Sequence, residues 1–241
     1  MDPIVLICSV TVEAEPLLPR LTEPKLHSET RLSLWSGKIG RRPVLVLVGG
    51  MGKTNAASSL TAVLETRPVA GVLGFGVAGA YEGSGLQVGD LALAEVEHYG
   101  DEGVATPDGW ISCEGIGIPL LQDAARRLYN NFPVDPEDLR AVRRALADRG
   151  TPAASGGFVT VSCCSGTAAR GRELAQRFGA ICETMEGAAY AHVAARYSVP
   201  FLELRGVSNL VEDRDPSRWR LSTAAATAAD ALPTIVTTWN P

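Results

Sequence analysis

The sequence has few of the residues that usually bind metal ions. Its 241 residues include three histidines and five cysteines, and the cysteines follow no regular spacing. Cys163 and Cys164 are adjacent, so they cannot form the Cys-x-x-Cys pair of a zinc site, and we interpret the cysteines as free thiols. The scarcity of histidine argues against a zinc site and against a histidine-based catalytic triad. The sequence therefore predicts neither a metal nor another cofactor.

The sequence also lacks a run of lysine or arginine, and its formal net charge is −5. A nucleic-acid-binding surface needs clustered cations to neutralise phosphates, so we expect no binding to DNA or RNA. Asp2 and the absence of an early basic region argue against a signal peptide. The apolar block at 69–77 is too short to span a bilayer. We therefore expect a cytoplasmic protein without a membrane segment.

Strand-like and helix-like segments alternate along almost the whole chain. Apolar, β-branched runs predict strands at 4–10, 32–35, 44–48, 69–75, 90–96, 154–162 and 200–207. Helical spacing predicts helices at 53–65, 119–129, 136–149, 167–178 and 217–237, with a loop over 99–118. This alternation predicts a single α/β domain over residues 1–241, with three α/β/α layers around a twisted, mixed and mostly parallel sheet.

Two polar side chains follow segments that read as strands. Glu186 closes one such segment and opens an Ala-rich helix, and Asn209 follows the strand predicted at 200–207. Ligands in open α/β sheets bind beyond the carboxyl ends of the strands, so the two side chains predict a small-molecule site. A carboxylate suits the hydroxyls of a ribose, and an amide offers both a donor and an acceptor. The structural alternatives are a surface glutamate at a helix start and an Asx turn.

Glu13 and two glycine-rich segments are further candidates. Glu13 follows the first strand, where a carboxylate either stabilises a helix N-terminus or acts as a general base on water. Residues 49–54 read Gly-Gly-Met-Gly-Lys-Thr, but Leu47 stands where a Walker motif needs glycine. This turn can still offer backbone N–H groups to a ligand. Residues 74–79 either admit a flat ligand or allow close packing.

Taken in order, these segments resemble the purine nucleoside phosphorylase/hydrolase superfamily, from residue 4 to about 227. The matching segments are Glu13 after the first strand, the Gly-Met-Gly-Lys turn, 76–80, 157–160, 185–188 and 205–209. The resemblance implies that Glu13 and Asn209 are catalytic, with Glu13 activating the attacking water. It also implies that an aromatic side chain stacks on the purine. The implied substrate-binding residues are Val77, Ala78, Gly79, Phe158 (the stacking aromatic), Val159 (backbone contacts to the base), Met185, Glu186 (the ribose) and Ser208.

Within this superfamily, the run at 208–215 followed by Trp219 is most similar to the futalosine hydrolases. Adenine-specific nucleosidases carry aspartate at the position of Asn209, where it protonates N7. Asparagine cannot act as that acid, but it can donate to O6 or N7 of a 6-oxopurine, which favours hypoxanthine as the leaving group. The resemblance implies hydrolysis of the N-glycosidic bond of futalosine, releasing hypoxanthine and dehypoxanthine futalosine, a step of menaquinone biosynthesis.

The alternatives are a methylthioadenosine/S-adenosylhomocysteine nucleosidase, a purine nucleoside phosphorylase and a nucleoside-binding module without activity. A phosphorylase needs cationic donors for phosphate. The turn at 49–55 offers only Lys53, although Arg41, Arg42 or a partner subunit could supply a cation. This pattern favours water as the nucleophile.

The resemblance also implies a homodimer or a higher homo-oligomer, because relatives complete the 5′ side of the site with a neighbour's loop. Two roles remain open for Arg214. It either reads the aromatic carboxylate on the 5′ side of the nucleoside or forms an ion pair with Asp213 or Asp215.

Overall fold

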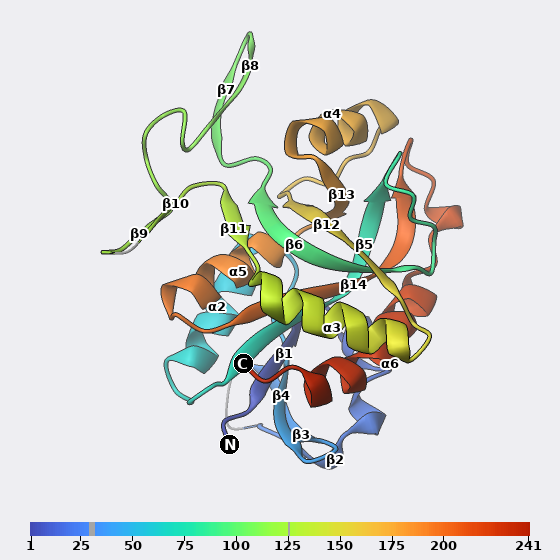
Figure 1. Cartoon of the computed structure of the whole chain (residues 1–241). Coiled ribbons are helices and arrows are strands. Elements are labelled where there is room, and N and C mark those ends of the chain that lie inside the picture. The colour runs from blue at the N-terminus through green and yellow to red at the C-terminus, as the bar shows by residue number, and fades with distance from the viewer. Residues whose placement is uncertain (29–31, 125) are drawn as a thin grey trace.

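The protein is built on one large mixed sheet (Figure 1). The computed structural model describes residues 1–28, 32–124 and 126–241. Within these residues the sheet has ten strands, in the order β11-β6-β12-β13-β5-β1-β4-β3-β2, with β14 paired to β5 and β6. The strands are β1 (Ile4–Cys8), β2 (Thr22–Leu26), β3 (Ser33–Ile39), β4 (Arg42–Val48), β5 (Gly71–Tyr81), β6 (Leu91–Tyr99), β11 (Asn131–Pro133), β12 (Ala153–Thr160), β13 (Ala180–Thr184) and β14 (Phe201–Val211).

Helices cover both faces of the sheet, and β1 shows how. Its five residues are all apolar and buried, and it pairs in parallel with β4 and β5. Ile4 and Leu6 pack with side chains of α3 and α6, whereas Val5 and Ile7 pack with side chains of α2 and α5. Successive residues of a strand point to opposite faces, so the two helix pairs lie on opposite sides. The helices are α1 (Thr11–Ala14), α2 (Lys53–Leu64), α3 (Pro136–Asp148), α4 (Ala168–Phe178), α5 (Gly187–Arg196) and α6 (Leu221–Thr238).

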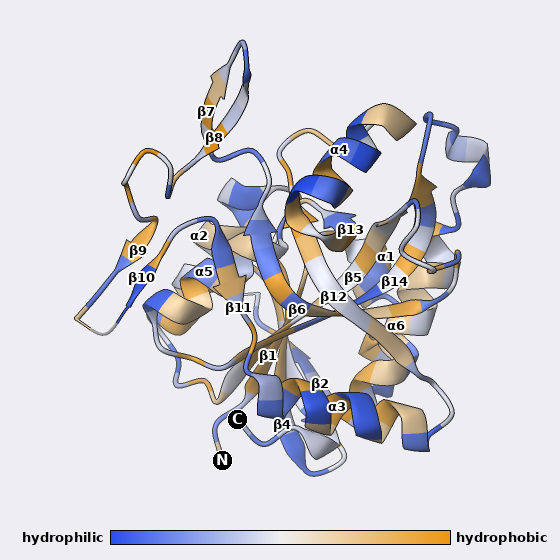
Figure 2. Cartoon of the chain, turned by 45° about the horizontal axis from the view of Figure 1, so that its top comes forward, coloured by the Kyte–Doolittle hydropathy of each residue, from blue (hydrophilic) through white to orange (hydrophobic). Residues whose placement is uncertain are grey.

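This architecture confirms the predicted α/β fold with helices around a mixed sheet. Figure 2 shows that α3 and α4 carry both hydrophilic and hydrophobic residues. Such amphipathic helices pack one face on the sheet and expose the other. In α3 the buried face consists of Leu139, Val142 and Leu146. None of the helices in the described part of the chain is long and apolar enough to cross a membrane.

The strands β5 and β14 are longer than the sequence predicts. They pair in parallel beyond the predicted strand ends, as far as Tyr81 and Val211, because each supplies the backbone partners of the other. The register shifts between Val207 and Asn209, which marks a β-bulge. Asn209 therefore lies in a bulged strand and not beyond a strand end, which corrects its expected position.

The helix predicted at 119–129 is wrong in the described part of that segment; residue 125 lies outside the described residues. The chain forms a hairpin of β9 (Leu121–Gln122) and β10 (Arg127–Leu128), with Leu120 N donating to Leu128 O at 2.9 Å. Leucines of both strands pack on a buried cluster around Phe132. These tertiary contacts outweigh the local helical preference.

A second hairpin, β7 (Gly103–Thr106) and β8 (Gly109–Ser112), lies in the segment predicted as a loop. Both hairpins project from the body of the molecule (Figure 1).

Gly206 provides a test of how closely β14 packs on α6. A Cβ atom at Gly206 would lie 2.1 Å from the carbonyl oxygen of Ala224, so Gly206→Ala must push the helix away. Overpacking of this kind lowers the free energy of unfolding by about 1–3 kcal/mol. Urea unfolding measures the change. Gly166→Ala is the control, because a Cβ atom there meets nothing within 4 Å. Equal stability of the two variants would contradict the close packing.

Candidate active site

A cavity of about 230 Å³ lies beside the C-terminal ends of β1 and β13 and the bulged part of β14. It gathers residues from separate parts of the chain, as the sequence predicts. Glu13, Asn209, Val77, Ala78, Gly79, Met185, Glu186 and Ser208, all predicted site residues, line it. The other described residues of the lining are Ser9, Val10, Met51, Cys164, Ser165, Glu183, Thr184, Val211, Arg214, Trp219 and Leu221.

The carboxylate of Glu13 is fixed in the floor of the cavity. Its side chain is 1% exposed. Oε2 accepts hydrogen bonds from Ser9 N at 2.8 Å, Ser9 Oγ at 2.8 Å and Val10 N at 3.1 Å. Oε1 accepts from Val77 N at 2.8 Å. Glu13 therefore organises the start of α1 and also lines the cavity.

Glu186 is the second carboxylate of the cavity. It precedes α5, is 3% exposed, and its Oε1 accepts from Gly52 N at 2.8 Å. The glycine-rich turn therefore holds a carboxylate through its backbone N–H. Burial raises the pKa of Glu186, while the charge of Arg205 and the bond from Gly52 oppose the rise. Met185 lies beside Glu186 in the lining. A buried carboxylate with a free oxygen can accept hydrogen bonds from sugar hydroxyls.

Asn209 has its amide oriented by its neighbours. Ser208 Oγ lies 2.8 Å from Asn209 Oδ1, and Asn209 Nδ2 donates to Leu210 O at 3.0 Å. An amide NH₂ group carries two hydrogens, so one remains for a ligand. The arrangement offers the cavity a donor and not an acid.

A buried cation lies behind this floor. Arg205 is 1% exposed; its Nε donates to Glu203 Oε1 at 2.7 Å, and its Nη1 lies 3.7 Å from Glu13 Oε1. Burial alone would lower the pKa of Arg205, but the charges of Glu203, Glu13 and Glu186 outweigh it and hold the pKa above its usual range. Arg205 therefore remains charged and neutralises the surrounding carboxylates.

Two further carboxyl groups, Glu97 and Glu203, meet below α5. Both are fully buried, and a Cβ atom at Gly187 would lie 2.5 Å from Glu97 Oε2 and 2.7 Å from Glu203 Oε1. Burial raises the pKa of Glu97 well above its usual range, and the charge of Glu203 adds to the rise. Burial also raises the pKa of Glu203, but the charge and the hydrogen bond of Arg205 oppose that rise, so Glu97 is the more readily protonated of the two carboxyl groups. In the sequence, this cluster is marked by charged residues within otherwise apolar strands: Glu97 in β6, and Glu203 and Arg205 in β14.

Two residues predicted to contact the base do not line the cavity. Phe158 and Val159 are 0% exposed and lie on β12. Phe158 packs in the core with side chains of the sheet. Cys164 and Ser165, in the loop after β12, line the cavity.

Sequence reasoning missed Glu183. Its Oε1 accepts from Ser165 N at 2.7 Å, and its Oε2 accepts from Ser165 Oγ at 2.6 Å and from Tyr81 OH at 3.2 Å. These bonds attach the loop after β12 to β13. An acidic residue within an otherwise apolar strand was the available indication.

Lys53 points away from the cavity. Its Nζ pairs with Asp101 at 2.6 Å and Glu102 at 2.7 Å. Arg42 contacts Met1 and Asn240, and neither Arg41 nor Arg42 lines the cavity. Among the residues of this chain that the sequence proposed as phosphate ligands, none reaches the site.

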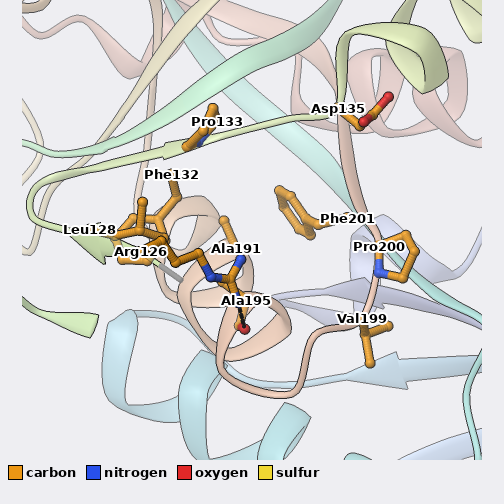
Figure 3. Close-up of a pocket in the computed structure, with 10 residues that line it drawn as sticks. All are labelled: Arg126, Leu128, Phe132, Pro133, Asp135, Ala191, Ala195, Val199, Pro200 and Phe201. Carbon is orange, nitrogen blue, oxygen red and sulfur yellow. Dashed lines mark hydrogen bonds between the residues drawn. The ribbon is translucent and has the colours of Figure 1, made fainter. Parts of the chain in front are cut away.

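A different cavity, also of about 230 Å³, lies beside α5 and β11 (Figure 3). Its lining is mainly apolar and includes Phe132, Pro200 and Phe201. Arg126 Nη2 donates to Ala195 O at 2.7 Å, which satisfies one of its donors. It contains none of the residues predicted for the site, so we assign the candidate active site to the first cavity.

Comparison with known proteins places the chain in a family. A family model described as the phosphorylase superfamily matches residues 3–238. A futalosine hydrolase of Thermus thermophilus is 37% identical over 214 residues, covering 88% of this chain and 90% of that protein. A futalosine hydrolase of Streptomyces coelicolor is 34% identical, and the match covers 81% of each.

Solved structures share the fold. The 5'-methylthioadenosine/S-adenosylhomocysteine nucleosidase of Neisseria meningitidis, in complex with methylthio-immucillin-A, matches with a TM-score of 0.84 at 24% identity. The match covers 98% of this chain and 99% of that chain. Both comparisons agree with the resemblance and the fold class that the sequence indicates.

The proton on Glu97 gives a pH-dependent stability. Between the ordinary and the raised pKa, the folded state holds a proton that the unfolded state has released, so the free energy of unfolding falls as pH rises. The slope reaches at most about 1.4 kcal/mol per pH unit. Glu97→Gln keeps the side chain neutral and removes this slope, so the variant gains stability relative to the wild type as pH rises above the ordinary pKa of glutamate.

Urea unfolding at several pH values measures the difference. Glu95→Gln on the same strand is the control, because Glu95 is exposed. Parallel stability curves for the wild type and Glu97→Gln would show that Glu97 is ionised in the folded state.

Proposed function

The chain belongs to the phosphorylase superfamily, and we propose that it hydrolyses the N-glycosidic bond of futalosine. The products are hypoxanthine and dehypoxanthine futalosine, which makes the reaction a step of menaquinone biosynthesis. The convergence of Glu13, Glu186 and Asn209 on one cavity carries the proposal, together with relatives at 33–37% identity that are futalosine hydrolases. The substrate is accordingly a purine nucleoside.

In the proposed reaction, Glu186 holds the ribose and Glu13 acts on water. The free oxygen of Glu186 accepts from the 2′- and 3′-hydroxyls. Glu13 accepts a proton from the water that attacks C1′ as the bond to the base breaks. General base catalysis of this kind contributes about 10²–10⁴-fold. Met185 packs beside the sugar, and Val77, Ala78 and Gly79 form the opposite wall.

Asn209 stabilises the departing base. Its remaining Nδ2 hydrogen donates to N7 or O6 of hypoxanthine, where negative charge develops as the bond breaks. Ser208, bonded to Asn209 Oδ1, keeps the NH₂ group facing the ligand. A preorganised donor directed at developing charge is worth about 3–4 kcal/mol.

Water is favoured over phosphate as the nucleophile. Lys53 is occupied by Asp101 and Glu102, and the carboxyl groups of Glu13 and Glu186 line the cavity. Repulsion between two anions in a poorly solvated cavity disfavours a phosphorylase. We further propose that the protein is cytoplasmic and needs no cofactor and, on the resemblance, that it acts as a homodimer or higher homo-oligomer.

The proposal is tested by phosphate-free incubation with futalosine, aminofutalosine, methylthioadenosine and inosine in parallel, with chromatography of the released base. Hypoxanthine from futalosine is the expected product. Release of adenine in place of hypoxanthine would identify a methylthioadenosine nucleosidase, the fold of which the structure shares. Release that begins only when phosphate is added would identify a phosphorylase.

Glu13→Gln is expected to lower kcat for futalosine by about two to four decades, because an amide cannot take a proton from water. Steady-state kinetics measure the loss, and circular dichroism checks the fold, since Glu13 also accepts several backbone hydrogen bonds. Glu15→Gln is the control, because Glu15 is exposed and lies outside the cavity. Near-normal turnover of a folded Glu13→Gln variant would remove Glu13 as the base.

Asn209→Asp is expected to shift the preference for the base. A carboxylate repels the electron-rich O6 and N7 edge of hypoxanthine, so kcat/KM for futalosine falls by about 10²–10³-fold. The same carboxyl group can accept from a 6-amino group, so adenine release from methylthioadenosine rises relative to hypoxanthine release. Asn131→Asp, an exposed asparagine outside the cavity, is the control. An unchanged ratio would show that Asn209 does not read the base.

A further inference from the structure

The mouth of the active-site cavity is unusually apolar for a protein surface. Val10 is 39% exposed, Met51 59% and Leu221 41%. Trp219, partly buried, lies in the same lining. The four side chains come from three separate segments, and large exposed apolar side chains gathered around a cavity indicate a surface that contacts a ligand or partner. The hydroxyl-rich ribose has little apolar surface to offer them.

One cation stands among these residues. Arg214 is the only lysine, arginine or histidine among the described residues that line the cavity. Its guanidinium carbon lies 4.5 Å from the ring centroid of Trp219, the geometry of a cation–π contact. This contact holds the planar guanidinium group over the indole ring at the rim.

The hydrogen-bond donors of the Arg214 guanidinium are free. The neighbouring aspartates are occupied elsewhere: Asp213 Oδ1 accepts from Ala168 N at 3.0 Å, and Asp215 Oδ1 accepts from Ser217 N and Oγ. Within residues 1–28, 32–124 and 126–241, the guanidinium group makes neither an ion pair nor a hydrogen bond. Arg218, four residues away, instead pairs with Glu212 at 2.6 Å.

The charges of the cavity are therefore separated by depth. The carboxylates of Glu13 and Glu186 lie at the floor, 1% and 3% exposed, and Arg214 lies at the exposed rim. An anionic group on a ligand is repelled by the floor and attracted by the rim. The cavity thus fits a ligand with a hydroxyl-rich middle and an apolar end that carries a negative charge.

We propose that Arg214 and Trp219 bind an aromatic carboxylate attached to the 5′ side of the nucleoside. The guanidinium group takes the carboxylate through two parallel N–H donors, a geometry that lysine cannot supply. The ring of the ligand lies against Trp219 and the apolar rim. This assignment rests on the proposed function and names the part of the substrate that separates futalosine from simple purine nucleosides such as inosine.

The test compares futalosine with its carboxamide analogue, which keeps the ring but removes the charge. Hypoxanthine release is measured for both substrates with the wild type, Arg214→Gln and Arg218→Gln. The wild type is expected to prefer the acid by about tenfold in kcat/KM, mainly through KM, as for a charge-assisted bidentate pair. Arg214→Gln brings the ratio to about one, and Arg218→Gln leaves it as in the wild type. Arg214→Lys retains part of the preference.

The outcomes separate the two proposals. If the wild type releases hypoxanthine but Arg214→Gln leaves the ratio of kcat/KM for the acid to kcat/KM for the amide unchanged, only the role of Arg214 is overturned. An equal loss on both substrates also overturns it, because the arginine then acts on the base or the ribose. If the wild type releases hypoxanthine from neither substrate, the proposed function is overturned, and so is the carboxylate site at Arg214 and Trp219.

Discussion

The site depends on one buried cation. Arg205 lies between Glu203 on its own strand and Glu13 on α1, with Glu186 and the protonated Glu97 nearby. An unpaired buried carboxylate is costly, and removal of one partner of a buried pair commonly costs about 3–5 kcal/mol. Arg205 offsets the negative charge of the carboxylates around it. Arg205 also links β14 to α1 through Glu13. This one interaction therefore supports both the geometry of the site and the packing of the sheet.

Glycines make room for this charge cluster. A Cβ atom at Gly74 would lie 2.7 Å from Glu203 Oε2, and one at Gly76, where φ is +145°, would lie 2.1 Å from Glu13 Oε1. Gly187 has the same relation to Glu97. From sequence, the glycines at 74–79 suggested close approach of a flat ligand or of a helix. The structure shows a third reason, because the missing side chains at Gly74 and Gly76 leave room for the buried carboxylates of Glu203 and Glu13.

Much of the fold follows from the sequence because apolar periodicity is a local property. The strand β1 and the helices α2, α3 and α4 lie close to their predicted bounds. The pairing of β9 with β10 and the bulge at Ser208 do not follow from this local periodicity, because contacts with residues distant in the sequence determine them. The positions of Glu13 and Glu186 in one cavity follow from their places near strand ends, whereas Asn209 reaches the cavity from the bulge within β14. The burial of Phe158 does not follow from the sequence, since a resemblance of motifs does not fix which residue of a strand leaves the core.

The charge distribution also explains how one scaffold can select its nucleophile. A negative floor tolerates a neutral nucleophile such as water and repels an anion, unless a cation is added beside it. Lys53, the first residue of α2 after the glycine-rich turn, could supply such a cation, but it pairs with Asp101 and Glu102. Because Lys53 is held in these ion pairs, the glycine-rich turn can offer a ligand only its backbone N–H groups. A phosphate site would therefore require Lys53 to abandon two partners and approach Glu186, which already occupies the N–H of Gly52.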